Sequence, residues 1–215
     1  MSAPRLYLIR HAEVESRYQN TFGGQIDMNL SPRGHAQARA LAGYLHRLPI
    51  VALYASPMKR VQQTLAPWLG KGAPRPVCLP GLREVDFGDW TGLGWEAVKA
   101  QFGRSAWDWL HHLDRGEVPN GETGAVFRAR VEPCVAQIVR EQAGRDVAVV
   151  CHGGVVRMIL AILLDLPLPQ TVVLAVDYAS VTRVALGPPR AELELLNFVP
   201  WEGLPAGSDI ETLHG

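Results

Sequence analysis

Apolar residues in this chain form short unbroken runs, and longer segments with a helical period lie between them. Val147–Cys151 is an apolar run of the usual length of a buried strand. Arg5–Ile9 and Ile50–Ala55 are similar runs, and each of them leads directly into polar residues. We therefore expect three buried strands at these places.

A helix is expected to begin directly after Ser31-Pro32. Serine is a favoured N-cap, and proline is well tolerated at the first helical position. Apolar residues then recur at steps of three, four and three, which marks one face of a helix: Ala38, Leu41, Leu45 and Leu48. Comparable patterns predict helices at Met58–Trp68, at Trp95–Leu113 with a break at Gly103, at Glu122–Gln142 and at Val155–Leu164.

The remaining segments are interpreted as loops and late strands. Pro74–Pro80 is a connection with at most a very short strand, and Leu82–Gly94 has no clean period and is interpreted as a loop. Val172–Leu186 and Ala191–Val199 are rich in β-forming residues, and the turn signal Gly187-Pro188-Pro189 separates them. Strands that alternate with helices predict an α/β fold, a three-layer α/β/α sandwich with a mostly parallel sheet. The late segments are expected to pair antiparallel at its edge.

Length and composition fit one domain over residues 1–215, with 47% hydrophobic and 20% charged residues. The 21 basic and 21 acidic residues balance, so no global field favours a nucleic acid or a membrane as partner. Any anion site must therefore be built locally. The longest apolar run, Met158–Leu164, is too short to cross a bilayer.

The cysteines and the N-terminus favour a soluble, cytoplasmic protein. Cys78, Cys134 and Cys151 are odd in number and widely spaced, which argues against a disulfide framework and against a zinc site. Met1–Arg10 lacks the long apolar core of a signal peptide. A reducing compartment is therefore expected.

Chemically active side chains follow three of the predicted strands. The first strand leads into Arg10-His11, the strand ending at Cys151 leads into His152-Gly153-Gly154, and Arg60 lies one helical turn beyond Ser56-Pro57. Ligands of open α/β sheets bind at the carboxyl ends of strands, so these side chains would share one rim. A guanidinium reaches two phosphoryl oxygens at once, and a glycine-rich helix start offers N–H groups to the same anion. The pattern favours a phosphoryl-binding site.

Taken singly, each of these residues has an ordinary explanation. A lone His11 or His152 is most often a surface or capping residue, Arg60 a solvated helix residue, and Gly153-Gly154 a tight turn. Their shared position at strand ends gives the interpretation its weight.

Six motifs in a fixed order carry a family resemblance. They are Leu8-Ile9-Arg10-His11, Leu30-Ser31-Pro32-Arg33-Gly34, Ala55-Ser56-Pro57-Met58-Lys59-Arg60-Val61-Gln62-Gln63-Thr64, Leu82-Arg83-Glu84-Val85-Asp86-Phe87-Gly88, Pro119-Asn120-Gly121-Glu122-Thr123 and Cys151-His152-Gly153-Gly154-Val155-Val156-Arg157. From about residue 5 to about residue 185, the chain closely resembles the histidine phosphatase superfamily, which has a phosphoglycerate mutase-like fold. The likeness is strongest to the phosphatase branch that includes α-ribazole phosphatases.

The resemblance implies a role for each matching residue. His11 matches the nucleophilic histidine that becomes phosphorylated, and Glu84 matches the proton donor to the leaving oxygen; with His152 they form the implied catalytic set. The residues implied to hold the phosphoryl group are Arg10, Arg60, His152 and Gly153. Two guanidiniums and a second histidine can neutralise a transferring phosphoryl group in place of a metal, so no metal and no cofactor are expected.

Three positions depart from the family pattern. Ala12 stands where the family usually has glycine, so the backbone at this position must adopt an ordinary angle. Arg17 stands where asparagine is frequent, and it either adds a third cation for the substrate or points to solvent. Gly23 stands where threonine is usual; with Gly24 it aligns with a segment that touches substrate, but the two also fit a plain turn.

A rival interpretation starts from Cys151. Cys151 and Arg157 are separated by five residues, the spacing of the cysteine-dependent phosphatase loop, and a thiolate at a helix N-terminus is a plausible nucleophile. This leaves Arg10-His11, Arg60 and Glu84 without a role. We therefore interpret Cys151 as a small buried residue.

Two residue clusters between Glu84 and Gly121 have open interpretations. His111-His112 with Asp108 and Asp114 suggest a metal site, although an exposed polar helix face is the commoner explanation. The tryptophans of this part of the chain suggest stacking on a flat substrate, and core or lid packing is the alternative: Trp90, Trp95, Trp107 and Trp109.

The implied function is hydrolysis of a small phosphorylated metabolite through a phosphohistidine. A phosphoglycerate mutase is one alternative, although dedicated mutases carry a longer insertion between the counterparts of Glu84 and His152. A non-catalytic phospho-ligand binder on the same fold is another, and the joint presence of His11, Glu84 and His152 argues against it. We expect a lid-like insertion over roughly 93–120, a loosely ordered tail over 200–215, and a homodimer as one option for assembly.

Overall fold

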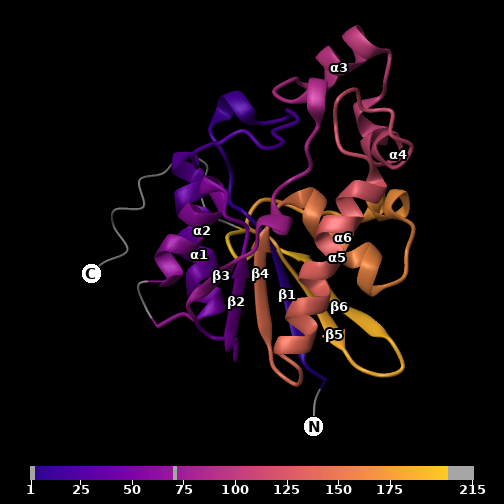
Figure 1. Ribbon diagram of the computed structural model, residues 1–215. Helices are drawn as coiled ribbons and strands as arrows, with labels where there is room; N and C mark the ends of the chain where they lie inside the picture. Colours follow the sequence, from indigo (N-terminus) through magenta and orange to yellow (C-terminus); the bar gives the residue numbers. More distant parts are fainter. Residues whose placement is uncertain (1–2, 70–71, 203–215) are drawn as a thin grey trace.

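A computed structural model describes residues 3–69 and 72–202 of the chain. Its centre is a six-stranded sheet with the strand order β3-β2-β4-β1-β5-β6 (Figure 1). The strands are β1 (Arg5–Arg10), β2 (Ala52–Ala55), β3 (Pro76–Cys78), β4 (Val147–Cys151), β5 (Val181–Leu186) and β6 (Ala191–Phe198). β1 to β4 pair in parallel, and β5 and β6 add antiparallel at one edge, which confirms the predicted fold class.

Alternating side chains of the central strands build two cores. Leu6 and Leu8 of β1 face one core together with Cys151 of β4, while Tyr7 and Ile9 face the other. Because successive side chains of a strand point to opposite faces, a strand buried on both sides appears as an unbroken apolar run. This explains why Val147–Cys151 was recognisable in the sequence.

Helices cover both faces of the sheet. α1 (Pro32–Leu45) and α2 (Lys59–Leu69) pack on the face of Tyr7 and Ile9, and α5 (Gly124–Glu141) and α6 (Gly153–Leu163) pack on the opposite face (Figure 1). Ser31 caps α1 as predicted, since its hydroxyl accepts a hydrogen bond from the Gly34 N–H at 2.9 Å. No helix within the described residues is long and apolar enough to cross a membrane.

Residues 93–120 form a separate group of short helices above the carboxyl ends of β1 and β4 (Figure 1). They contain α3 (Trp95–Phe102), a 3₁₀ turn (Ala106–Asp108) and α4 (Trp109–Asp114). The predicted break at Gly103 is present, because Gly103 ends α3 with a left-handed φ of 63°. The tail expected to be loosely ordered lies almost entirely outside the described residues.

One predicted strand is largely wrong. Of Val172–Leu186 only β5 is a strand, and Leu168–Val173 is a 3₁₀ helix. Val172 and Val173 are 43% and 81% exposed. Strand propensity depends on packing against neighbouring strands, and these valines have no such neighbour.

Several predicted boundaries also move by one or two residues. β2 begins at Ala52 instead of Ile50, and α5 spans Gly124–Glu141 instead of Glu122–Gln142. α6 begins at Gly153, two residues before the expected start, because His152 is its extended N-cap. The shift places the first turn of α6 directly beside His152.

Candidate active site

A cavity of about 240 Å³ opens where β1, β4 and the first turns of α2 and α6 meet, beneath the 93–120 helices. Four charged residues line it, namely Arg10, Arg60, Glu84 and Arg157. The other lining residues are His11, Val14, Tyr18, Thr21, Phe22, Gly23, Gly24, Met28, Phe87, Trp95, Trp109, Gly153, Gly154, Val176 and Tyr178. The strand-end residues singled out from the sequence therefore do meet at one rim.

Arg60 occupies the centre of the site and is only 2% exposed. Its Nε donates to His11 Nε2 and to His152 Nδ1, each at 3.2 Å. Its two terminal nitrogens donate to the carbonyls of Ile26 and Gly24, each at 2.8 Å. Arg60 thus fixes both imidazoles relative to each other and joins them to the loop that contains Gly24.

These hydrogen bonds determine the tautomer of each histidine. His11 Nδ1 lies 2.8 Å from the carbonyl oxygen of Ala12, which can only accept, so Nδ1 carries the proton and Nε2 carries the lone pair. His152 Nδ1 accepts from Arg60, so its Nε2 carries the proton and donates to Ser56 Oγ at 2.8 Å. His11 therefore presents a nucleophilic nitrogen at the arginine-rich part of the cavity.

Both imidazoles are held neutral. Burial lowers the pKa of His11 well below its usual value, and the charges of Arg60 and Arg10 lower it further. Burial also lowers the pKa of His152 well below its usual value, again with a contribution from Arg60. A neutral imidazole is the form that can attack phosphorus.

Arg10 is held in place by residues that the sequence did not single out. Its guanidinium stacks over the ring of Tyr178 at 3.9 Å and donates to the Val176 carbonyl at 2.7 Å. Arg10 Nε is buried without a hydrogen-bond partner among the described residues. A buried donor of this kind at a cavity wall is what an anionic ligand would satisfy. Tyr178 comes from an irregular segment before β5, so no motif marked it.

Glu84 faces the first turn of α6. Its carboxylate accepts from the Val85 N–H at 3.0 Å and from the Gly154 N–H at 3.3 Å. A Cβ at Gly154 would lie 2.6 Å from Glu84 Oε1, so this position must be glycine for the carboxyl to sit there. A Cβ at Gly153 would approach Arg10 Nε only to 3.6 Å, which is ordinary contact.

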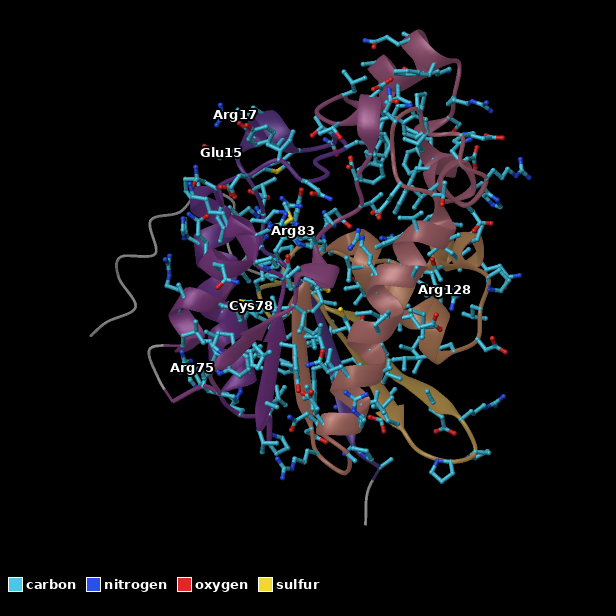
Figure 2. All side chains as sticks on the ribbon, in the orientation of Figure 1. Glu15, Arg17, Arg75, Cys78, Arg83 and Arg128 are labelled. Carbon is cyan, nitrogen blue, oxygen red and sulfur yellow. The ribbon has the colours of Figure 1, made fainter. Side chains whose placement is uncertain are left out.

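The other predicted site residues divide into two groups. Gly23 and Gly24 line the cavity, and the Gly24 carbonyl anchors Arg60. Arg17 does not line it; Figure 2 shows Arg17 beside Glu15 at the surface, where the two side chains pair at 3.2 Å. Ala12 has no left-handed backbone angle, as expected for a residue other than glycine.

The cysteine interpretation does not fit the structure. Cys151 is fully buried in the core between β4 and α5–α6 and does not line the cavity. Burial raises the pKa of its thiol, which disfavours a thiolate. Arg157 does line the cavity, but its terminal nitrogens donate to the carbonyls of Gly153 and Leu174 at 3.3 and 3.0 Å.

The four tryptophans between Glu84 and Gly121 lie in different environments. Trp90 is fully buried in the core, Trp95 and Trp109 line the cavity, and Trp107 is 70% exposed. His112 pairs with Glu117 Oε2 at 2.7 Å. Core packing therefore accounts for Trp90 only.

A family model described as the histidine phosphatase superfamily (branch 1) matches residues 6–199. An adenosylcobalamin/alpha-ribazole phosphatase of Escherichia coli is 29% identical over 90% of this chain and 95% of its own length. Phosphoserine phosphatase 1 of Hydrogenobacter thermophilus is 28% identical over 90% and 92%. The solved structure of a mycobacterial glucosyl-3-phosphoglycerate phosphatase in complex with VO3 superposes with a TM-score of 0.79 at 28% identity, covering 91% of this chain and 100% of that one.

Proposed function

Because this chain belongs to branch 1 of the histidine phosphatase superfamily and is a phosphohydrolase, we propose that it cleaves a small phosphomonoester through a phosphohistidine at His11. The observation that carries the proposal is the buried, neutral His11. Its Nε2 lone pair is free of a proton and lies 3.2 Å from Arg60 Nε. A nucleophile next to a guanidinium suits the transfer of a phosphoryl group.

In the first step, His11 Nε2 gives up the hydrogen bond that it accepts from Arg60 Nε, and its lone pair forms a bond to phosphorus. The bond from phosphorus to the ester oxygen breaks, and its electron pair leaves with that oxygen. Glu84, entering the reaction as a carboxylic acid, gives its proton to the leaving oxygen and becomes a carboxylate. The Ala12 carbonyl, 2.8 Å from His11 Nδ1, stabilises the proton that remains on the phosphorylated ring.

In the second step, water replaces the released alcohol. The Glu84 carboxylate takes a proton from this water, the water oxygen bonds to phosphorus, and the N–P electron pair returns to His11 Nε2. Inorganic phosphate leaves, and Glu84 is a carboxylic acid again. The two steps together consume one phosphomonoester and one water and release one alcohol and one phosphate.

The chain's own cations supply the charge for this reaction. Arg10 and Arg60 line the cavity, and the first N–H groups of α6 lie beside them at Gly153. His152, bonded to Arg60 and Ser56, stays neutral and fixes the position of Arg60. We therefore propose a metal-independent reaction.

Domain organisation and surroundings belong to the same proposal. We propose one catalytic domain with residues 93–120 as its lid, and a cytoplasmic protein with no nucleic-acid partner. The relatives named above act on different phosphorylated compounds, so they support a small phosphorylated substrate in general.

Rapid quenching with a ³²P-labelled phosphomonoester tests the proposal. We expect an acid-labile, base-stable phosphoryl label that peptide mapping places on His11, and turnover that survives exhaustive chelation. A label on Cys151, or activity that chelation removes and one divalent ion restores, would overturn the mechanism. Conversion of 3-phosphoglycerate to 2-phosphoglycerate faster than its hydrolysis would instead identify a mutase. Phosphate binding without any turnover would identify a non-catalytic binder.

A further inference from the structure

We propose that this enzyme selects phosphomonoesters whose alcohol carries a flat, uncharged aromatic ring, and that Trp95 and Trp109 bind that ring. This inference deepens the proposed function and rests on it, since the ring must belong to the leaving alcohol of the same reaction. It concerns the outer part of the cavity, which we define as Tyr18, Phe22, Met28, Phe87, Trp95 and Trp109.

Charge is confined to the inner part of the cavity, which we define as Arg10, His11, Arg60, Glu84, Gly153, Gly154 and Arg157. Arg10 ends β1, Arg60 lies in the first turn of α2, and Arg157 lies in α6, so all three belong to the sheet rim. Glu84, the one acidic residue of the lining, faces the same helix end. The 93–120 region contributes only Trp95 and Trp109 to the lining.

The charges of the 93–120 region are directed elsewhere. Arg104 pairs with Glu117 at 2.9 Å, and His112 contacts the same carboxylate at 2.7 Å. Lys99 is exposed and does not line the cavity. A carboxylate on the leaving alcohol would therefore be removed from water without a partner from this region, which is costly.

The charge of Arg157 lies in the inner part of the cavity, on α6 and away from the outer aromatic residues. Both of its terminal nitrogens already donate to backbone carbonyls, those of Gly153 and Leu174. A Cβ at Gly153 would lie 3.6 Å from Arg157 Nη1 and 3.6 Å from Arg10 Nε, so the N–H groups that Arg157 keeps free lie beside Arg10, where the phosphoryl group is expected to bind. Phosphorylated acids are consequently the less favoured class.

The outer aromatic residues are arranged to keep flat faces available. The rings of Trp109 and Phe87 meet edge to face at 5.3 Å, and Phe87 contacts Phe22 at 4.8 Å. Trp95 and Trp109 are only half-buried, unlike the core residue Trp90, so part of each ring remains uncovered. An aromatic wall of this kind favours an uncharged planar ligand.

Trp107 is the positioning residue of this wall. It lies outside the cavity, is 70% exposed, and meets the Trp95 ring edge to face at 4.4 Å. A tryptophan this exposed gains little from burial. Trp107 instead acts through its contact with Trp95, because this contact restricts the orientation of the Trp95 ring towards the cavity.

A matched pair of substrates isolates the ring as the recognised feature. 2-Phenylethyl phosphate and 2-cyclohexylethyl phosphate have similar size and similar leaving oxygens, and they differ in flatness and π character. Stacking on an aromatic side chain typically changes binding by about ten-fold. We expect kcat/KM to favour the phenyl ester by about this factor, and O-phosphoserine to react more slowly than both.

Variants of the wall identify its residues. Trp95→Leu and Trp109→Leu should each bring the phenyl-to-cyclohexyl ratio of kcat/KM close to one, whereas Phe198→Leu, an aromatic change on β6 away from the cavity, should leave it intact. Trp107→Leu should reduce the ratio by raising KM for the phenyl ester while kcat is retained. Because each ratio is measured within one protein, partial loss of folded enzyme cancels.

Three results would overturn the inference. They are a ratio near one in the unmodified enzyme, a ratio that survives both wall variants, or a preference for O-phosphoserine that Arg157→Gln removes. Absence of any hydrolysis together with absence of label on His11 would instead reject the proposed function. The two failures are therefore distinguishable.

Discussion

The inner and outer parts of the cavity differ in both chemistry and origin. The inner part is polar and deeply buried, with Arg60 at 2% and His11 at 5% exposure, and it is assembled from strand ends and helix starts. The outer part is aromatic and partly open, and its tryptophans come from the short helices of residues 93–120. One cavity thus joins a buried polar part at the sheet rim to an aromatic part that another region of the chain supplies.

Under the proposed function, this difference separates the reaction from the choice of substrate. Side chains at a sheet rim are fixed by backbone pairing, so they hold a phosphoryl group in the same way whatever alcohol is attached. Short helices outside the sheet can change in sequence without disturbing the strands. Changes in the inner part should therefore act through the phosphoryl group and the leaving oxygen, and changes in the outer part should act through the rest of the alcohol.

The largest loss is expected for His11→Ala. Removing the nucleophile should lower kcat by about 10⁴-fold or more for every phosphomonoester, because no covalent intermediate can form. Cys151→Ser is the matched control, since Cys151 packs in the core behind the site. It should keep most activity in the same steady-state assay, and an inactive Cys151→Ser beside an active His11→Ala would reverse the assignment.

Glu84→Gln should divide substrates by their leaving group. An alkyl phosphate needs the proton from Glu84, and we expect its kcat/KM to fall by about 10²–10⁴-fold. p-Nitrophenyl phosphate releases a stable phenolate and should lose far less. The measurement is kcat/KM for both substrates across pH. Equal losses would mean that Glu84 only positions the arginines, and Asp86 or Asp89 would become the candidate acid.

Gly154→Ala should produce a weaker form of the same pattern. The new methyl group would lie 2.6 Å from Glu84 Oε1, so the carboxyl must move. Displacement of a catalytic group by about 1 Å can cost up to about 10²-fold, and the loss should be larger for alkyl phosphates than for p-nitrophenyl phosphate. Gly43→Ala is the control, because a Cβ there meets nothing within 4 Å. A fully active Gly154→Ala would show that the close approach is unimportant.

Acid should weaken the fold through the two buried histidines. Burial lowers their pKa values in the folded chain. Below about pH 6.5, these histidines therefore bind protons in the unfolded chain but stay neutral in the folded chain. The free energy of unfolding should therefore fall as pH decreases from about 6.5 to 5, by up to about 1.4 kcal/mol per pH unit for each histidine. Urea unfolding at several pH values measures this slope.

Substitutions test whether these two histidines cause the pH dependence of the free energy of unfolding. His11→Asn and His152→Asn should each flatten the pH dependence, and His35→Asn, a change at an exposed histidine, should leave it as it was. A slope that all three variants share would place its origin elsewhere.

Much of the fold could be predicted from local pattern. The buried run at Val147–Cys151 became β4 with the same bounds, and the Ser31 cap and the Gly103 break lie where the sequence indicated. These signals are local, since each depends on a few neighbouring residues. The strand expected from Val172 onward does not form at Val172 and Val173, because no neighbouring strand packs against these residues.

The sequence by itself determined which residues meet, since motif order and strand ends already placed His11, Arg60 and His152 at one rim. Their roles in the reaction stay a prediction. Only the tertiary structure decided how they meet: Arg60 Nε between two imidazoles, and Tyr178 against Arg10. These contacts join residues at least 49 positions apart in the chain, so their geometry depends on strand order and helix packing. Trp90 is buried in the core and Trp95 lines the cavity. Only the packing of the helices could distinguish the two, because the local sequence does not determine whether a ring faces the core or the cavity.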